Sequence, residues 1–195
     1  MAIYSLNLGF ISRGAGRSSV GFSAYISGSK VQDERTGATF NFSHKQDILG
    51  GRVLAPDFAP SWALDPAKLW NAVEAFEDHI ANLRFRGGEN SQDAKEKFIN
   101  SAQTAQTIMG ALPLELTRDQ AESCVEDFLK QRFVSRGLVV QYAIHWEKHN
   151  PHFHGLVTRR PLQDGRFANR KDREIVSKSE HNQTRALWAE VANKH

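Results

Sequence analysis

Residues Leu138 to Thr158 read LVVQYAIHWEKHNPHFHGLVT, and this stretch decides how the rest of the chain is organised. Val139 to Ile144 is mostly apolar, β-branched and aromatic, which is the composition of a strand buried on both faces. Glu147 to Pro151 contains turn residues, and Phe153 to Thr158 is again strand-like. We therefore predict a β-hairpin.

The predicted hairpin brings three histidines together. His145 ends the first strand, and His152 and His154 share one face of the second because strand side chains alternate, with Phe153 in the opposite layer. Three neutral imidazoles suit a first-row divalent ion and leave coordination positions open for substrate, as in catalytic sites. The alternative is a chance His-X-His pattern in a chain with 8 histidines. We expect His149, in the turn, to be solvated.

Length and charge narrow the remaining classes. A chain of 195 residues is expected to form one domain, or one domain with a small appendage, and can bury a real core. The net charge is only +3, but residues 159–178 carry +4 and residues 1–55 carry +3, whereas residues 115–127 carry −4. The two basic tracts are candidates for phosphate contacts, with solvated surface as the alternative.

Cysteine usage and hydropathy lead us to expect a cytoplasmic protein. Cys124 is the single cysteine, so an intrachain disulfide is excluded. The sequence contains neither a signal peptide nor an apolar run long enough to span a bilayer.

The first third of the chain is predicted to be strands, turns and one ambiguous segment. Residues 2–11 are predicted to form a strand whose apolar residues alternate at Tyr4, Leu6, Leu8 and Phe10, and residues 13–17 a flexible basic loop. Residues 18–28 fit either a helix capped by serine or a strand of period two. We expect short strands and turns over residues 31–55.

The rest of the chain mixes helices with the hairpin. A helix begins at Asp65-Pro66, followed by an exposed break over residues 86–93 and a second helix that reaches about Met109. Thr117 caps another helix, with Gly137 as its C′ residue, and a last helix covers residues 179–192. Interspersed strands and helices indicate an α/β or α+β layer fold.

Tyr25 is the tyrosine best placed to react. Tyr4 and Tyr142 sit inside predicted strands among large apolar neighbours, whereas Tyr25 lies in a serine- and glycine-containing segment beside a basic loop. Packing of Tyr25 on the sheet is the alternative.

Several collinear motifs resemble one known family. They are Ser12-Arg13, Gly16-Arg17-Ser18 leading to Ala24-Tyr25, the run LWNAVEAFE at residues 69–77, ALPLEL at 111–116, Ile144-His145 followed by PHFH at 151–154, and RALWA at 185–189. Their order and spacing resemble the MobA/MobL family of plasmid relaxases, in particular the relaxase domains of the TraA type.

The resemblance implies a histidine-hydrophobe-histidine endonuclease fold and activity. The expected fold is a central antiparallel sheet flanked by helices, with the histidines on its two middle strands and Tyr25 on a helix over them. Tyr25 would nick one DNA strand at a transfer origin, stay attached to its 5′ phosphate and later religate the strand. His145, His152 and His154 would hold a divalent ion, Mn²⁺, Mg²⁺ or Zn²⁺.

The chain also departs from the family pattern. Thr107 and Met109 stand where many relatives have acidic residues, and residues 82–103 look like an inserted helical segment. Glu77 matches an acidic position of the family motif and is our leading catalytic carboxylate, ahead of Glu74 and Glu34.

The resemblance further implies partners. Single-stranded DNA at the transfer origin is the expected substrate of a monomer without membrane insertion, with relaxosome accessory proteins and a type IV coupling protein as further partners. Residues 1–195 are expected to be a single nicking domain, the N-terminal fragment of a longer protein. The candidate DNA-binding residues are Arg13, Arg17, Arg159, Arg160, Arg166, Arg170 and Lys171.

Three other functions remain open from the sequence. A rolling-circle replication initiator shares the metal motif, but chemistry with two adjacent tyrosines is excluded because Tyr25 has no tyrosine neighbour. A metal-dependent phosphoesterase that activates water would make Tyr25 dispensable. A non-catalytic DNA-binding module would tolerate loss of the histidines.

Overall fold

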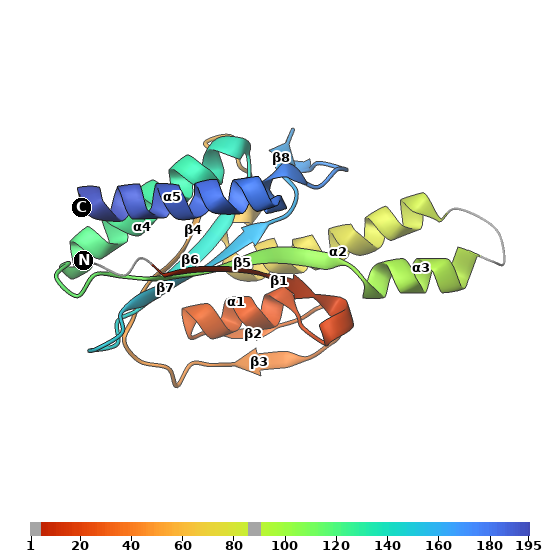
Figure 1. Cartoon of the computed structure of the whole chain (residues 1–195). Coiled ribbons are helices and arrows are strands. Elements are labelled where there is room, and N and C mark those ends of the chain that lie inside the picture. Colours follow the sequence, from red (N-terminus) through yellow and green to blue (C-terminus); the bar gives the residue numbers. More distant parts are fainter. Residues whose placement is uncertain (1–4, 86–90) are drawn as a thin grey trace.

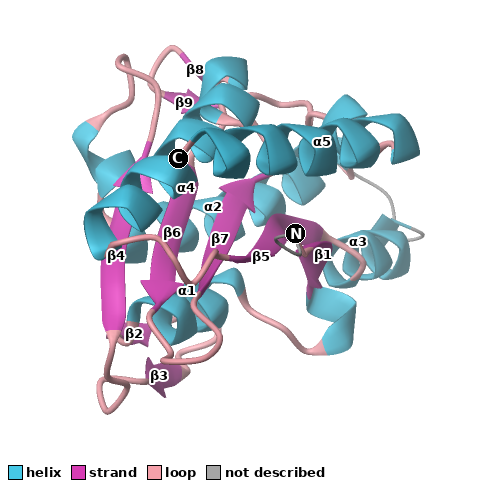
Figure 2. Ribbon diagram, turned by 60° about the vertical axis from the view of Figure 1, so that its left-hand side comes forward, coloured by secondary structure: helices cyan, strands magenta, loops and turns pink. Residues whose placement is uncertain are grey.

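A five-stranded antiparallel sheet forms the centre of the computed structural model, which describes residues 5–85 and 91–195 (Figure 1). The strand order is β1-β5-β7-β6-β4, so β1 and β4 are the edges (Figure 2). These strands are β1 Leu6–Ser12, β4 Ile48–Leu54, β5 Gln103–Ala111, β6 Val140–His145 and β7 His152–Thr158. Two small sheets pair β2 Lys30–Gln32 with β3 Thr39–Asn41, and β8 Leu162–Gln163 with β9 Arg166–Phe167.

Helices cover both faces of the large sheet. The α-helices are α1 Ser19–Ser27, α2 Pro66–Arg84, α3 Ser91–Asn100, α4 Arg118–Arg132 and α5 Lys178–Lys194. Helices α4 and α5 lie on one face and α1 with α2 on the other, while α3 projects to one side beside the end of α2 (Figure 1). This arrangement confirms the predicted fold class. Within the described residues, no helix has the length and hydropathy needed to cross a membrane.

Two apolar cores hold the layers together, and the hairpin contributes to both. Phe153 packs against Phe128 and Trp188 beneath α4 and α5, with ring centroids 6.1 and 5.0 Å away. Leu156 lies on the opposite face of the sheet from Phe153. It belongs, together with Trp70, to the core under α1 and α2. All residues of β6 are buried, and those of β7 are buried except His152. The predictions of a hairpin and of a first strand buried on both faces are therefore confirmed.

Polar caps begin the helices where the sequence predicts them. The Asp65 carboxylate accepts a hydrogen bond from the Lys68 amide at the start of α2. Thr117 starts α4 in a reciprocal capping box with Gln120. Ser18 accepts from the Gly21 amide, so the ambiguous segment is the helix α1.

The sequence prediction for residues 103–111 was wrong. These residues do not extend the preceding helix, which ends at Asn100, but form β5, paired with β1 on one side and β7 on the other. Pairing on both edges and burial of Ile108 outweigh a weak helical pattern, as tertiary context often does.

Smaller differences concern helix ends and loops. Gly137 ends the 3-10 turn Val134–Arg136, since α4 already ends at Arg132. The predicted basic loop starts with a 3-10 turn, Arg13–Ala15. Tyr4 and residues 86–90 of the predicted break lie outside the described residues.

Candidate metal centre and nucleophile

The hairpin register places the three histidines in one cluster. His145 pairs directly with His152 across β6 and β7, and His154 follows on the same face of β7. Their ring centroids are 5.3 Å apart for His145 and His152, 4.6 Å for His145 and His154, and 5.0 Å for His152 and His154. One nitrogen from each ring lies within 4.8 Å of the others. The predicted convergence of the imidazoles is thus present.

Backbone carbonyls define which nitrogen each ring presents to the cluster. His145 Nε2 lies 3.0 Å from the Ile26 carbonyl, and His152 Nδ1 lies 2.7 Å from the Asn150 carbonyl. A carbonyl only accepts, so these nitrogens carry the protons, leaving a lone pair on His145 Nδ1 and on His152 Nε2. His154 Nε2 is buried without a hydrogen-bond partner. Each ring therefore offers one nitrogen, and the set fits a metal ion.

Electrostatics favour the neutral form that a metal requires. Burial lowers the pKa of His154 to about 3, and the neighbouring His145 and His152 act in the same direction. Burial also lowers the pKa of His145. An all-imidazole set suits Zn²⁺ and similar transition ions better than Mg²⁺, which prefers oxygen ligands. Among the described residues, no carboxylate belongs to the cluster.

Tyr25 projects from α1 beside this cluster. Its ring centroid lies 6.0 Å from that of His145 and 5.8 Å from that of His154. Phe22 and Phe42 flank the ring, with centroids 5.9 and 5.5 Å away. Tyr25 is nevertheless 36% exposed, so the side chain is held in place by aromatic contacts but is open to a substrate.

Buried hydrogen bonds fix α1 on the sheet. The side-chain oxygen of Gln141, on β6, accepts from the Ser23 hydroxyl of α1 and from the Trp70 indole of α2, each at 2.7 Å. All three side chains are fully buried. The position of α1 over the histidine strands is therefore set by interior contacts.

Sequence reasoning missed Lys45. Its ammonium lies 3.6 Å from the centroid of the Tyr25 ring and donates to the Tyr25 carbonyl at 3.3 Å. Burial lowers the pKa of Lys45. A lysine 20 residues further along the chain, in a loop, carries no motif that would have pointed to this contact.

Glu77, which the resemblance implied as a catalytic carboxylate, lies in a buried ion-pair network outside the histidine cluster. Its carboxylate accepts two hydrogen bonds from Arg160, at 2.9 and 3.1 Å, and pairs with Lys171 at 3.1 Å. Arg160 follows His154 by six residues, about 20 Å of extended chain. Glu77 also lies about one turn beyond the α2 residue that contacts the start of α1, whereas Tyr25 is near the end of α1. Its partners indicate a structural role.

The two runner-up carboxylates are also placed elsewhere. Glu74 accepts from the Ser19 hydroxyl at 2.5 Å and from Arg13 Nε at 2.8 Å, so it joins the start of α1 to the basic turn. Glu34 is exposed, and its amide donates to Asn71.

The basic candidates fall into two groups. Arg13 pairs with Glu74 and with Asp78, and Arg159 and Arg160 are 5% and 6% exposed, so these guanidinium groups are committed inside the protein. Lys171 donates to the Gln103 carbonyl at 2.7 Å, in addition to its contact with Glu77.

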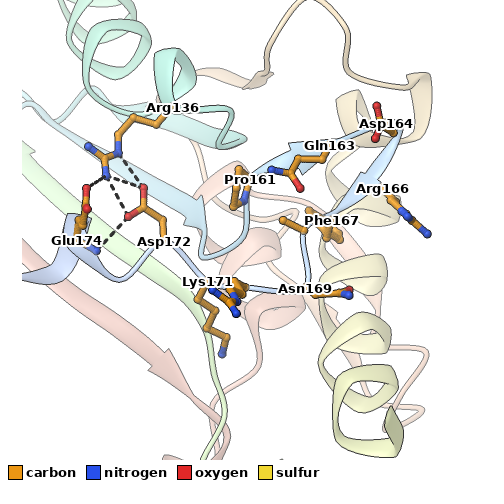
Figure 3. A pocket seen from close by; sticks show the side chains of 12 residues that line it. Arg136, Pro161, Gln163, Asp164, Arg166, Phe167, Asn169, Lys171, Asp172 and Glu174 are labelled. Atoms are coloured by element: carbon orange, nitrogen blue, oxygen red, sulfur yellow. Dashed lines mark hydrogen bonds and ion pairs between the residues drawn. The ribbon is translucent and has the colours of Figure 1, made fainter. Parts of the chain in front are cut away.

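The exposed group is formed by Arg17, Arg166 and Arg170. Arg166, Arg170 and Lys171 line a hollow of about 520 Å³ that is formed mainly by the segment after β7 (Figure 3). Asp172 and Glu174, in the same hollow, pair with Arg136. Of the predicted phosphate contacts, these exposed arginines keep their charge available to a ligand.

Comparisons with known proteins agree over nearly the whole chain. The chain is 32% identical over 181 residues to the conjugal transfer protein TraA of Rhizobium radiobacter, covering 88% of this chain and 15% of that protein. It is 33% identical over 177 residues to the probable mobilization protein MobA of Bifidobacterium longum, covering 89% of this chain and 28% of that protein. The chain thus spans less than a third of the length of these two relatives.

A solved structure shows the same fold. It comes from work described as "Molecular Basis of Vancomycin Resistance Transfer in Staphylococcus aureus" and matches with a TM-score of 0.82 at 27% identity, over 100% of this chain and 92% of the other. A sequence model of the MobA/MobL family matches residues 17–84 and 89–195. The fold, the collinear motifs and this match together show that the chain belongs to the MobA/MobL family.

Proposed function

We propose that this chain is a relaxase domain that nicks and religates one DNA strand at a plasmid transfer origin and so initiates conjugative transfer or mobilisation. The observation that carries the proposal is the exposed Tyr25 ring, whose centroid lies within 6.0 Å of two rings of a three-histidine cluster. The names of the relatives, conjugal transfer and mobilization proteins, favour transfer over replication.

The proposed step is a transesterification at phosphorus. The Tyr25 phenol oxygen forms a bond to the scissile phosphorus and loses its proton, while the bond from phosphorus to the 3′ oxygen breaks and that oxygen gains a proton. The products are a 5′-phosphotyrosine and a free 3′ hydroxyl. The new ester keeps the energy of the phosphodiester, so the 3′ hydroxyl can reverse the reaction and rejoin the strand.

The side chains around Tyr25 prepare this step. A divalent ion on His145, His152 and His154 would polarise the scissile phosphate and balance its charge. Phe22 and Phe42 restrict the Tyr25 ring, and such restriction reduces the entropy lost on reaching the reactive geometry. A free phenol with a pKa near 10 is only about 0.1% ionised at neutral pH, so the surroundings must also favour removal of its proton.

Single-stranded DNA is the proposed substrate, with relaxosome accessory proteins and a type IV coupling protein as proposed partners. Among the predicted phosphate contacts, Arg17, Arg166 and Arg170 are exposed and available to the phosphates of the DNA. Arg13, Arg159 and Arg160 support the fold instead, since their guanidinium groups are buried or paired.

Covalent trapping tests the proposal. The chain is incubated with Mn²⁺ and 3′-labelled single-stranded oligonucleotides that tile the DNA next to its gene, because the protein attaches to the fragment carrying the 5′ phosphate. We expect one oligonucleotide to give a band on a denaturing gel that is larger by the 21.9 kDa chain. Tyr25→Phe should abolish this band while leaving DNA binding nearly intact, because it removes one oxygen and no charge.

Three results would count against parts of the proposal. An adduct that persists in Tyr25→Phe would remove Tyr25 from its role. Cleavage to a free 5′ phosphate without any adduct would indicate a phosphoesterase that activates water. Nicking by the parent chain in excess chelator would exclude the metal.

A further inference from the structure

We propose that Lys45 is a catalytic residue of this site, whose ammonium orients the Tyr25 ring and neutralises negative charge at the phosphate attacked by Tyr25. The inference rests on the proposed function and adds to it a residue that none of the family motifs singled out.

Two separate contacts bind Lys45 to the nucleophile. The ammonium lies 3.6 Å from the Tyr25 ring centroid, well inside the range of a cation–π contact. It also donates to the Tyr25 carbonyl, in the last turn of α1, where carbonyls lack partners within the helix. A cation at a helix C-terminus is favourable. The Lys45 ammonium therefore contacts both the backbone carbonyl and the ring of Tyr25.

The loop that carries Lys45 is itself anchored around Tyr25. The Lys45 amide donates to the Phe42 carbonyl at 3.0 Å, and the Phe42 ring contacts Tyr25 edge-on. The short segment from Phe42 to Lys45 thus brings both an aromatic ring and an ammonium into contact with the Tyr25 side chain.

The charge of Lys45 is available for the reaction. Among the described residues, no carboxylate forms an ion pair with it; Glu147 acts on it only at longer range. Burial lowers the pKa of Lys45, consistent with an ammonium that lacks a full solvent shell. Preorganised charge in such surroundings stabilises developing negative charge better than water does. Attack by Tyr25 brings negative charge to this point.

Lys45 also borders a hollow in the surface that is open to a substrate. It lines a hollow of about 930 Å³ whose wall includes Ser27, Ser29 and Lys30 at and beyond the end of α1. The flexible four-carbon stem of lysine lets its ammonium move from the ring face to a phosphate beside Tyr25. Lys45 therefore stands between the nucleophile and the open space.

Lys45→Met, Lys45→Arg and the control Lys130→Met form the test. Lys130 is exposed on α4, on the face of the sheet opposite α1, and pairs with Glu126. The rate of adduct formation is measured in a single turnover at saturating oligonucleotide and Mn²⁺. We expect Lys45→Met to lower this rate at least about tenfold, with Lys45→Arg recovering most of it and Lys130→Met changing it little. DNA affinity should change far less than the rate.

Metal affinity separates a catalytic from a structural effect. Lys45 acts electrostatically on His145 and His154, and its charge opposes a cation there. Lys45→Met should therefore bind Mn²⁺ as tightly as the parent or more tightly, by calorimetry, while its rate falls. A variant that loses metal affinity and rate together would show a merely structural role and overturn the inference.

The remaining outcomes are also decisive. A Lys45→Met rate within twofold of the Lys130→Met rate overturns the assignment of Lys45 while the proposed function stands. A parent chain that forms no Tyr25-dependent adduct overturns the proposed function, and this inference with it.

Discussion

Replacing Glu77 by alanine should destabilise the protein strongly and leave the chemistry intact. Its carboxylate is 3% exposed and holds Arg160 in a two-point pair, with Lys171 as a third contact. Without Glu77, the cations of Arg160 and Lys171 would lie close together in a largely buried place with no carboxylate between them. Carbonyls of Ala168 and Asn169 still accept from Arg160, so part of its hydrogen bonding survives.

The size of the effect follows from this geometry. Removing one partner of a buried ion pair costs about 3–5 kcal/mol, because the other charge is left uncompensated. For a domain of this length, each kcal/mol moves the melting temperature by about 2–4 °C, which gives a fall of roughly 6–20 °C. Glu77→Gln keeps the shape and one acceptor oxygen, so it should cost less.

Thermal unfolding followed by circular dichroism measures the stability, and single-turnover adduct formation at low temperature measures the chemistry. We expect both Glu77 variants to react within about threefold of the parent rate while folded. The control is Glu122→Ala, which removes a carboxylate from an exposed pair with Arg52 and should change stability by no more than about 1 kcal/mol. A rate loss of a hundredfold or more in a Glu77→Gln protein of normal stability would refute our reasoning and restore a catalytic role.

Two further predictions concern pH and salt. Burial holds the pKa of His154 at about 3 in the folded protein, so the unfolded chain, with a pKa near 6.5, binds this proton first. The free energy of unfolding of the metal-free chain should therefore fall as pH drops from 6.5 toward 3, by up to about 1.4 kcal/mol per pH unit from this group. Urea titrations at several pH values should show a shallower fall for His154→Gln than for the parent. Equal slopes of unfolding free energy against pH in the two proteins would contradict us. Arg170→Ala should flatten the plot of log binding constant against log salt by about 0.7 for single-stranded DNA, whereas Lys130→Ala, whose ammonium already pairs with Glu126, should leave the slope unchanged. An unaltered slope in Arg170→Ala would exclude a phosphate contact.

The hairpin could be predicted because its information is local. Alternation along β7 fixes the faces of His152, Phe153 and His154 whatever surrounds them, and the turn residues fix the register that brings His145 opposite His152. Helix caps such as Asp65 and Thr117 are local in the same sense. These features needed no knowledge of the rest of the fold.

The sequence could not predict the features that distant contacts decide. Residues 103–111 form a strand because β1 and β7 supply hydrogen bonds on both sides, and neither neighbour is visible in the segment itself. Glu77 and Arg160 are 83 residues apart, so a buried pair between them has no signature in sequence. The same holds for Arg13 and Glu74, at a separation of 61 residues. A charge pattern does not show such ion pairs, so Arg13 and Arg160 could not be distinguished from surface arginines in the sequence.

The end of α1 explains why Tyr25 and the histidine cluster keep a fixed spacing. A helix leaves its last four carbonyls without partners inside the helix, and two of those in α1 belong to Tyr25 and Ile26. Lys45 donates to the first and His145 Nε2 to the second. The second bond satisfies the helix end, selects the tautomer that leaves His145 Nδ1 free, and ties the histidine strand to the residue after Tyr25. A shift of α1 would therefore break a helix cap and disturb His145 together, so the geometry of Tyr25 and the histidines is held by the same contacts that complete the helix.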